Sequence, residues 1–165
     1  MPVVANGPVA ERIAGEIEHR LQRLLLGTSS PIRVREIVRP KRNESNTPIH
    51  LQIVLTQGDP EVDEALSHAG YPPATCWKQW FSIRCHLMPS ELDPTPVDTY
   101  QNYLVADIRR AVCKDASWWT FDGLAINSQW DNVIGSDMDG GLAAFNMPLI
   151  VWYRTDETDP YTLRA

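Results

Sequence analysis

The sequence lacks any apolar run of the roughly 20 residues that a membrane-spanning helix requires. Its first residues also lack the basic start and apolar stretch of a secretory signal. Cysteine is scarce: Cys76, Cys85 and Cys113 are widely spaced and form no Cys-x-x-Cys pair. These absences disfavour a membrane protein and a disulfide-stapled secreted scaffold, so we expect synthesis in the cytoplasm and three thiols packed as small apolar side chains.

Sequence motifs of the common enzyme classes are also missing. The chain has no G-x-x-x-x-G-K-[ST] or G-x-G-x-x-G loop, no G-x-S-x-G elbow and no H-E-x-x-H pair. These absences argue against the usual nucleotide-binding proteins, serine hydrolases and zinc proteases, and they leave open only an active site scattered through the chain. We therefore expect a non-enzymatic protein with no catalytic residues and no cofactor.

Charge is unevenly divided along the 165 residues, whose net charge is −6. Lys and Arg outnumber Asp and Glu in residues 1–60, whereas the acidic residues dominate residues 61–165. Phosphate backbones repel an acidic protein, so we expect no sequence-specific DNA binding. An acidic surface can still line a passage through which DNA slides, because it gives the DNA nothing to hold.

Hydrophobic periodicity predicts two amphipathic helices, at residues 8–26 and 96–114. Each has a proline in its first turn, and the first is followed by a glycine that fits the stop. We expect the charged side chains opposite the two apolar stripes to be solvated. Among these are Glu16, Arg20 and Asp107.

Alternation of apolar and polar residues predicts five strands, at residues 32–39, 49–56, 77–87, 124–130 and 142–154. The first two are expected to form a hairpin with a long, basic tip, because the polar residues between them are bounded by prolines. This order of elements, α-β-β-β-α-β-β, predicts an α+β fold with one mostly antiparallel sheet and two helices packed on it.

Three further segments are predicted to be irregular. Residues 57–75 form a long excursion with one short helical turn, and residues 131–141 form an acidic loop that contains glycine. Residues 155–165 form a flexible tail. No internal repeat or second hydrophobic core is evident, so we expect a single domain spanning residues 1–165.

Two patterns invite a metal interpretation. His50 and His86 take outward positions on two predicted strands, but a metal site needs three or four converging ligands, and Cys85 faces the other way. In the acidic loop, only Asp137 and Asp139 keep the alternate spacing of a calcium loop, and no closing glutamate follows. We therefore expect no metal site and interpret the acidic loop as a hairpin turn.

A basic cluster forms the first candidate functional surface. Its members are Arg33, Arg35, Arg39, Lys41 and Arg42. It is either a solvated hairpin, a phosphate-binding patch or, as we prefer, an electrostatic contact with the acidic part of a neighbouring copy. The candidate inter-subunit contact residues are Arg39, Lys41 and Arg42.

Tryptophan is abundant, with six copies in the chain. Adjacent Trp118 and Trp119 cannot both face one core from a regular strand, so at least one is expected under a loop or at an interface. A stacking platform for single-stranded nucleic acid is the competing interpretation, and the negative charge disfavours it.

The order of elements, the charged loop after Val38-Arg39-Pro40 and the closing stretch LIVWYRTDETDP at residues 149–160 together resemble the tail-terminator (tail-completion, minor tail protein) family of long-tailed bacteriophages. The resemblance covers most of the chain, and it concerns a pattern of elements without a catalytic signature. It implies a structural virion protein at the head-proximal end of the tail. Copies would form a ring, usually a homohexamer, that caps the tail tube, stops its polymerisation and joins the tail to the head connector.

The resemblance also implies partners and surfaces. The partners would be other copies of the chain, the tail tube protein, a head-side connector or stopper, and DNA that passes through the lumen without specific binding. The candidate lumen or joining residues are Asp131, Asp137, Asp139, Asp156 and Asp159. Two alternatives remain, namely another neck or tail subunit and a small enzyme with a scattered active site. The two long helices favour a terminator over an all-helical adaptor or a mostly β tube subunit.

Overall fold

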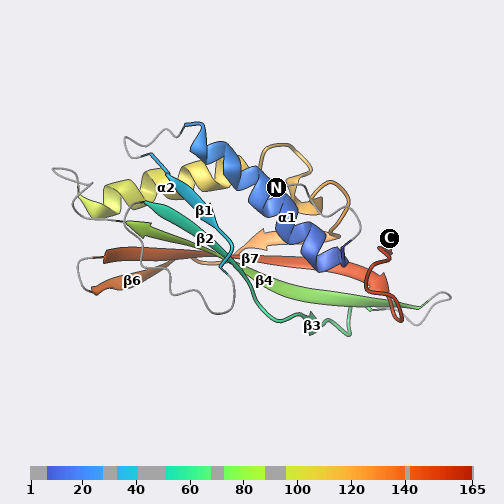
Figure 1. Ribbon diagram of the computed structural model, residues 1–165. Coiled ribbons are helices and arrows are strands. Elements are labelled where there is room, and N and C mark those ends of the chain that lie inside the picture. The colour runs from blue at the N-terminus through green and yellow to red at the C-terminus, as the bar shows by residue number, and fades with distance from the viewer. Residues whose placement is uncertain are drawn as a thin grey trace.

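A computed structural model of the chain describes residues 7–27, 33–40, 51–67, 73–87, 96–139 and 142–164. The described residues form an α+β fold with two α-helices and one mixed sheet of seven strands, which confirms the predicted class. Figure 1 shows both long helices on the same side of the sheet, so the fold has two layers. No helix within the described ranges is long and apolar enough to cross a membrane.

The helical layer consists of α1 (Val9–Leu21), which continues into the 3₁₀ helix η1 (Gln22–Leu25), and α2 (Val97–Val112). Each carries one apolar stripe at helical spacing, and that stripe faces the sheet and the other helix, as the sequence predicts. The buried side chains of the stripes are Val9, Ile13, Ile17, Leu21, Leu24, Tyr100, Leu104, Ile108, Ala111 and Val112. Asp107 is also buried, so the prediction that it is solvated is wrong.

The sheet runs in the order β1-β2-β4-β7-β5, with β3 paired to β4 and β6 paired to β7. Two long strands, β4 and β7, pair antiparallel at its centre along the whole of β4, with Ala74 opposite Asp156 and Leu87 opposite Ala143. The strands are β1 (Glu36–Val38), β2 (Gln52–Gln57), β3 (Glu61–Val62), β4 (Ala74–Leu87), β5 (Asn127–Trp130), β6 (Ile134–Asp139) and β7 (Leu142–Asp156).

Side chains alternate between the two faces of these strands, and this places the core. On β4 and β7 the odd-numbered apolar residues face the helices, and they include Phe81, Ile83, Cys85, Phe145, Met147, Leu149 and Val151. All of them are fully or almost fully buried. The predicted alternation of the third strand is therefore confirmed, because Phe81, Ile83 and Cys85 share the core face.

The predicted hairpin of the first two strands is wrong. β1 and β2 pair in parallel, with Ile37 opposite Ile53. A parallel pair needs a connection of about a dozen residues or more, and residues 39–51 supply one. The hydrophobic pattern of a strand is the same in either direction, so alternation alone did not reveal the direction of pairing.

Two predicted loops contain strands. Residues 134–139, within the expected acidic loop, form β6 and pair antiparallel with β7, with Ile134 opposite Asn146. The excursion at residues 57–75 contains β3, which pairs with β4, and a turn at residues 64–66. Residues 68–72 of that excursion lie outside the described ranges.

The C-terminal residues return along the end of β7. Thr155 forms an isolated bridge with Leu163, and Arg164 donates a backbone hydrogen bond to Arg154 at 3.1 Å. The backbone N–H of Val9, the first residue of α1, donates to the oxygen of Pro160 at 3.1 Å. The flexibility expected of residues 155–165 stays a prediction, but these bonds place residues 155–164 beside the start of α1.

Candidate functional site

Arg39 is the described member of the candidate contact set, and it is paired within its own chain. Its Nη1 lies 2.7 Å from Glu11 Oε1 and its Nη2 lies 3.2 Å from Glu11 Oε2. Glu18 adds a longer ion pair at 3.8 Å. The hydrogen bonds to Glu11 raise the pKa of Arg39 above its ordinary value. Arg39 therefore ties the residues after β1 to α1, and a neighbouring copy would have to compete with Glu11 for it.

The other two candidate contact residues, Lys41 and Arg42, lie outside the described ranges. Their assignment to an inter-subunit contact stays a prediction.

The acidic candidates are spread along β7 and do not gather in one patch. Asp131 is exposed just after β5, where its backbone N–H donates to Pro148. Asp156 ends β7, about 26 Å further along the strand at the usual rise per residue. Asp137 and Asp139 belong to β6, beside the first residues of β7, and their side chains are not among those described.

Asp156 and Asp159 organise the C-terminal segment. Asp156 Oδ2 accepts a hydrogen bond from Arg164, and its Oδ1 accepts from the backbone N–H of Thr158 at 3.0 Å. These bonds, with the one from Arg164 strongest, lower the pKa of Asp156 to about 2. Asp159 Oδ1 likewise accepts from the N–H of Tyr161 at 3.0 Å. Both carboxylates therefore hold turns of their own segment.

A buried charge network joins the two helices, and the sequence did not predict it. Arg20 is fully buried. Its Nε donates to Glu16 Oε1 at 2.7 Å, and its Nη1 donates to the backbone oxygen of Val112 at 2.8 Å. Its guanidinium carbon also lies 4.8 Å from the centre of the Phe121 ring. The prediction that Glu16 and Arg20 are solvated is therefore wrong.

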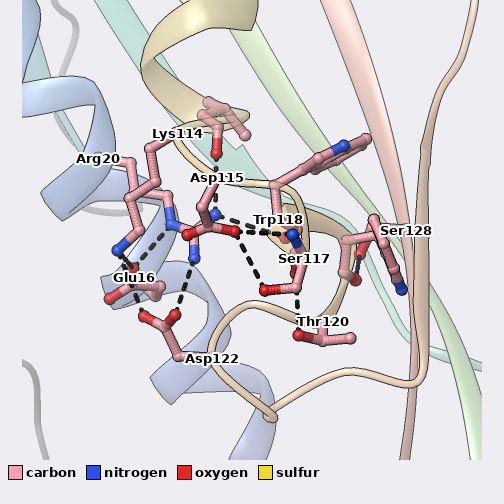
Figure 2. A network of polar contacts seen from close by, with 11 residues as sticks. Glu16, Arg20, Lys114, Asp115, Ser117, Trp118, Thr120, Asp122 and Ser128 are labelled. Carbon is pink, nitrogen blue, oxygen red and sulfur yellow. Dashed lines mark hydrogen bonds and ion pairs between the residues drawn. The ribbon is translucent and has the colours of Figure 1, made fainter.

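Lys114 and Asp122 complete this network, which Figure 2 shows from close by. Lys114 Nζ donates to Glu16 Oε1 at 3.2 Å and to Asp122 Oδ2 at 3.4 Å. Asp122 Oδ1 lies 3.6 Å from Arg20 Nη2. Burial raises the pKa of Asp122, but the hydrogen bond and charge of Lys114, together with the charge of Arg20 and a hydrogen bond with Glu16, outweigh it, so the pKa lies below its ordinary value.

The network has two cations and two carboxylates, so its charges compensate one another. It fastens the end of α2 and the following turn, which contains the 3₁₀ helix η3 (Trp118–Thr120), to α1. The turn needs this support because Phe121 and Asp122 adopt left-handed backbone angles, with φ of 46° and 59°. A signal was present in the sequence, since Arg20 lies three residues after Ile17 and four before Leu24, on the apolar stripe.

The adjacent tryptophans lie in η3, outside the described strands. Trp118 stacks on Trp130, with ring centres 6.2 Å apart, whereas the Trp119 side chain is 41% exposed. Trp130 Nε1 donates to Cys113 Sγ at 3.4 Å. Of the three thiols, Cys76 and Cys85 are buried and Cys113 is half-buried, so the prediction of buried cysteines holds for two of them.

The face of the sheet opposite the helices carries a second aromatic cluster, which we call the Trp80–Trp152 face. It consists of Lys78, Trp80, Ile150 and Trp152. Lys78 lies opposite Trp152 in the β4–β7 ladder, and Trp80 lies opposite Ile150. Lys78 Nζ is 4.5 Å from the ring centre of Trp80 and 5.7 Å from that of Trp152. The two rings therefore flank one cation.

His86 lies on the same side of β4, because it is an even-numbered residue of that strand. Burial, and then the charge of Arg84, lower the pKa of His86. Cys85 lies on the core face, where burial raises the pKa of its thiol, and His50 is outside the described ranges. Within the described part of the chain, no group of three or more His, Cys, Asp or Glu is placed to hold a metal ion.

A groove lies beside the end of η1. It has a volume of about 350 Å³ and is lined by Leu25, Arg33, Val34 and Arg35. Arg33 Nη2 donates to the backbone oxygen of Leu25 at 3.4 Å, and both arginines are exposed. Two members of the predicted basic cluster, Arg33 and Arg35, thus line the same groove, and Arg39 is not among its lining residues.

No protein-family model matches this chain, and a comparison with curated proteins finds no match. Its function is therefore inferred from the fold and from the surfaces described above.

Proposed function

We propose that the protein is a structural virion subunit whose copies form a ring on the end of a phage tail tube. The ring ends tube polymerisation and joins the tail to the head-side connector or stopper. Its partners are other copies of itself, the tube protein, the connector and the DNA that crosses its lumen. It assembles in the host cytoplasm and functions at the head-proximal end of the tail.

The Trp80–Trp152 face carries this proposal. An antiparallel sheet face that only meets water is normally polar. Here two half-buried tryptophans stand on a face that no helix covers among the described residues. Aromatic side chains are enriched at protein interfaces, so this face supports contact with another protein of an assembly.

Charge supports the passage of DNA without capture. The net charge of −6 makes binding to phosphate backbones unfavourable. A tail subunit must release the genome quickly, so a surface that repels phosphate suits a lumen.

The densest group of charged side chains supports a structural role over an enzymatic one. Arg20 and Lys114 both bond to Glu16, and Arg20 is inaccessible to solvent. A catalytic acid or base must reach its substrate, whereas these groups connect two helices and a turn. We therefore propose that the protein has no enzymatic activity.

The test combines solution mass with electron microscopy of tail tubes. We expect the purified chain to form a closed oligomer by light scattering and to cap one end of purified tubes in negative stain. Trp80→Ala should reduce binding to tube ends in a co-sedimentation assay. Trp119→Ala is the matched control, because it removes an exposed tryptophan that belongs to η3 and not to the Trp80–Trp152 face. A chain that stays monomeric and leaves tube ends uncapped would falsify the proposal.

A further inference from the structure

The groove beside Leu25 and the C-terminal segment have complementary charge and lie at opposite ends of the helix formed by α1 and η1. We infer that the groove binds residues 156–161 of a second copy, so that copies join head to tail. This inference rests on the proposed self-association, and it names the two surfaces that meet.

The groove has a basic rim and a small apolar surface. Arg33 and Arg35 supply two guanidinium groups and Leu25 supplies apolar atoms, whereas Val34 is almost fully buried. The side chain of neighbouring Leu26 is 89% exposed, which extends the apolar surface beyond the groove. A ligand that combines a carboxylate with a large apolar side chain would match this surface.

The C-terminal segment has that combination. Residues 156–161 read Asp-Glu-Thr-Asp-Pro-Tyr. Glu157 is exposed, and the Tyr161 side chain is 55% exposed. Tyrosine is a frequent anchor of protein interfaces because it combines a large apolar ring with a polar tip.

The segment also forms turn hydrogen bonds of its own. Asp156 accepts hydrogen bonds from both the N–H and the hydroxyl of Thr158, at 3.0 and 2.9 Å. Asp159 accepts from the N–H of Tyr161 at 3.0 Å. A segment that already holds its turns loses little conformational entropy on docking.

The two surfaces of one copy cannot meet each other. Pro160 bonds to Val9 at the start of α1, whereas Leu25 lies at the end of η1. The usual rise of an α-helix and of a 3₁₀ helix separates these points by about 27 Å. Figure 1 shows the C-terminus beside the start of α1, at the opposite end of that helix from η1.

A contact between different surfaces of identical copies is heterologous. Such contacts build a ring when the rotation closes and a filament when it does not. The groove and the segment therefore supply a repeating joint of the kind that a ring requires.

Charge reversal tests this joint. Arg35→Glu makes the groove acidic, and Glu157→Arg makes the segment basic. Each variant alone brings like charges together at every joint, so its self-association should be about tenfold weaker or more in analytical ultracentrifugation. Arg84→Glu, the same charge change at an exposed position of β4, should leave the mass unchanged.

Mixing the two variants gives the sharper test. An acidic groove from Arg35→Glu can then meet a basic segment from Glu157→Arg, and the remaining joints keep their original charges. In the mixture the two variants should alternate along the oligomer, and the oligomer should have the wild-type mass. Wild-type mass in both single variants, or no recovery in the mixture, overturns the inference.

A crosslinking measurement does not depend on charge. Leu26→Cys and Tyr161→Cys chains, mixed under mild oxidation, should form a disulfide-linked dimer. Neither variant alone should form it above the background set by Cys113, which is half-buried. Absence of the mixed dimer contradicts the joint, and so does a wild-type chain that is monomeric at every concentration.

Tube capping separates this inference from the proposed function. If wild-type oligomers cap tubes while Arg35→Glu and Glu157→Arg keep their mass, the joint is wrong and the proposed function stands. If the charge variants dissociate but wild-type oligomers do not bind tubes, the joint stands and the proposed function is wrong.

Discussion

Arg20 in α1 donates a hydrogen bond through Nη1 to the backbone oxygen of Val112, the last residue of α2, at 2.8 Å. The last carbonyl groups of a helix have no partner within the helix. A cation at this end also interacts favourably with the helix dipole. The buried guanidinium group of Arg20 thus caps the C-terminal end of α2 and remains paired with Glu16 on its own helix.

Removing Arg20 should destabilise the fold strongly. In Arg20→Met, Glu16 keeps its buried carboxylate and loses its closest cation, and Val112 loses its donor. Breaking a buried pair in this way costs roughly 3–5 kcal/mol. Urea unfolding followed by circular dichroism measures the loss. Arg23→Met, which removes an exposed arginine from η1, should change the free energy of unfolding by less than about 0.5 kcal/mol. Equal stability of the two variants would show that the network contributes no net stability.

Gly123 is placed in a backbone conformation that only glycine adopts easily. Its φ is +87°, and a Cβ would meet no atom within 4 Å, so strain arises from the backbone alone. We expect Gly123→Ala to lower the free energy of unfolding by about 1–2 kcal/mol. Gly27→Ala is the control, because Gly27 also has open space around it and no left-handed φ. A Gly123→Ala protein as stable as Gly27→Ala would contradict the strained turn.

The contact between Asp156 and Arg164 should respond to acid. The pKa of Asp156 is lowered to about 2 by bonds from Arg164 and Thr158. Since the folded value lies below the unfolded one of about 3.9, the carboxylate stabilises the folded segment above roughly pH 4. This contribution is lost as the pH falls toward 2. The stability difference between wild type and Asp156→Asn should therefore shrink between pH 5 and pH 2. A constant difference would mean that Asp156 does not titrate in this range.

Members of the basic cluster should separate into two kinds. Arg39 is paired with Glu11 at a partly exposed site, so Arg39→Met should cost no more than about 1 kcal/mol of stability and leave the oligomer mass unchanged. Reversing Lys41 and Arg42 to Glu should instead weaken ring formation. Light scattering on both variants makes the comparison. An unchanged oligomer mass for the Lys41 and Arg42 variant would show that these two residues do not form the inter-subunit contact predicted from the sequence.

The spacing of apolar residues in the sequence was sufficient to predict the helices and strands that bury one continuous row of apolar side chains. Phe81, Ile83 and Cys85 alternate with polar residues and occupy the core face of β4. The α2 stripe from Tyr100 to Val112 is likewise buried as predicted. In both cases, the local pattern and the final packing follow the same physical rule, since apolar side chains at a regular spacing are buried together.

Pairing partners could not be predicted from the same pattern. Ile37 and Ile53 lie opposite each other in a parallel pair, yet their sequence environments fit a hairpin equally well. Ile134 was assigned to a loop because glycine and aspartate surround it, although β7 supplies a partner strand there. Strand direction and strand addition depend on contacts between distant residues, which local patterns do not contain.

The candidate site was harder to predict because its residues act through tertiary contacts. Arg20 was expected in water, since arginine is rarely buried without a partner. Its partners come from the end of α2 and the turn after it, far away in sequence. Tryptophan abundance indicated an interface, but only the β4–β7 register brings Trp152 opposite Lys78.

The β4–β7 ladder also bears on when the protein can fold during translation. β4 is made early, but its main partner begins only at Leu142. Until β7 leaves the ribosome, one edge of β4 has no partner and the apolar row at Phe81, Ile83 and Cys85 lacks its neighbours on that side. Such contacts between distant residues slow folding, and unpaired edges favour aggregation. A nascent chain that stalls before β7 should therefore depend on chaperones more than the finished protein does.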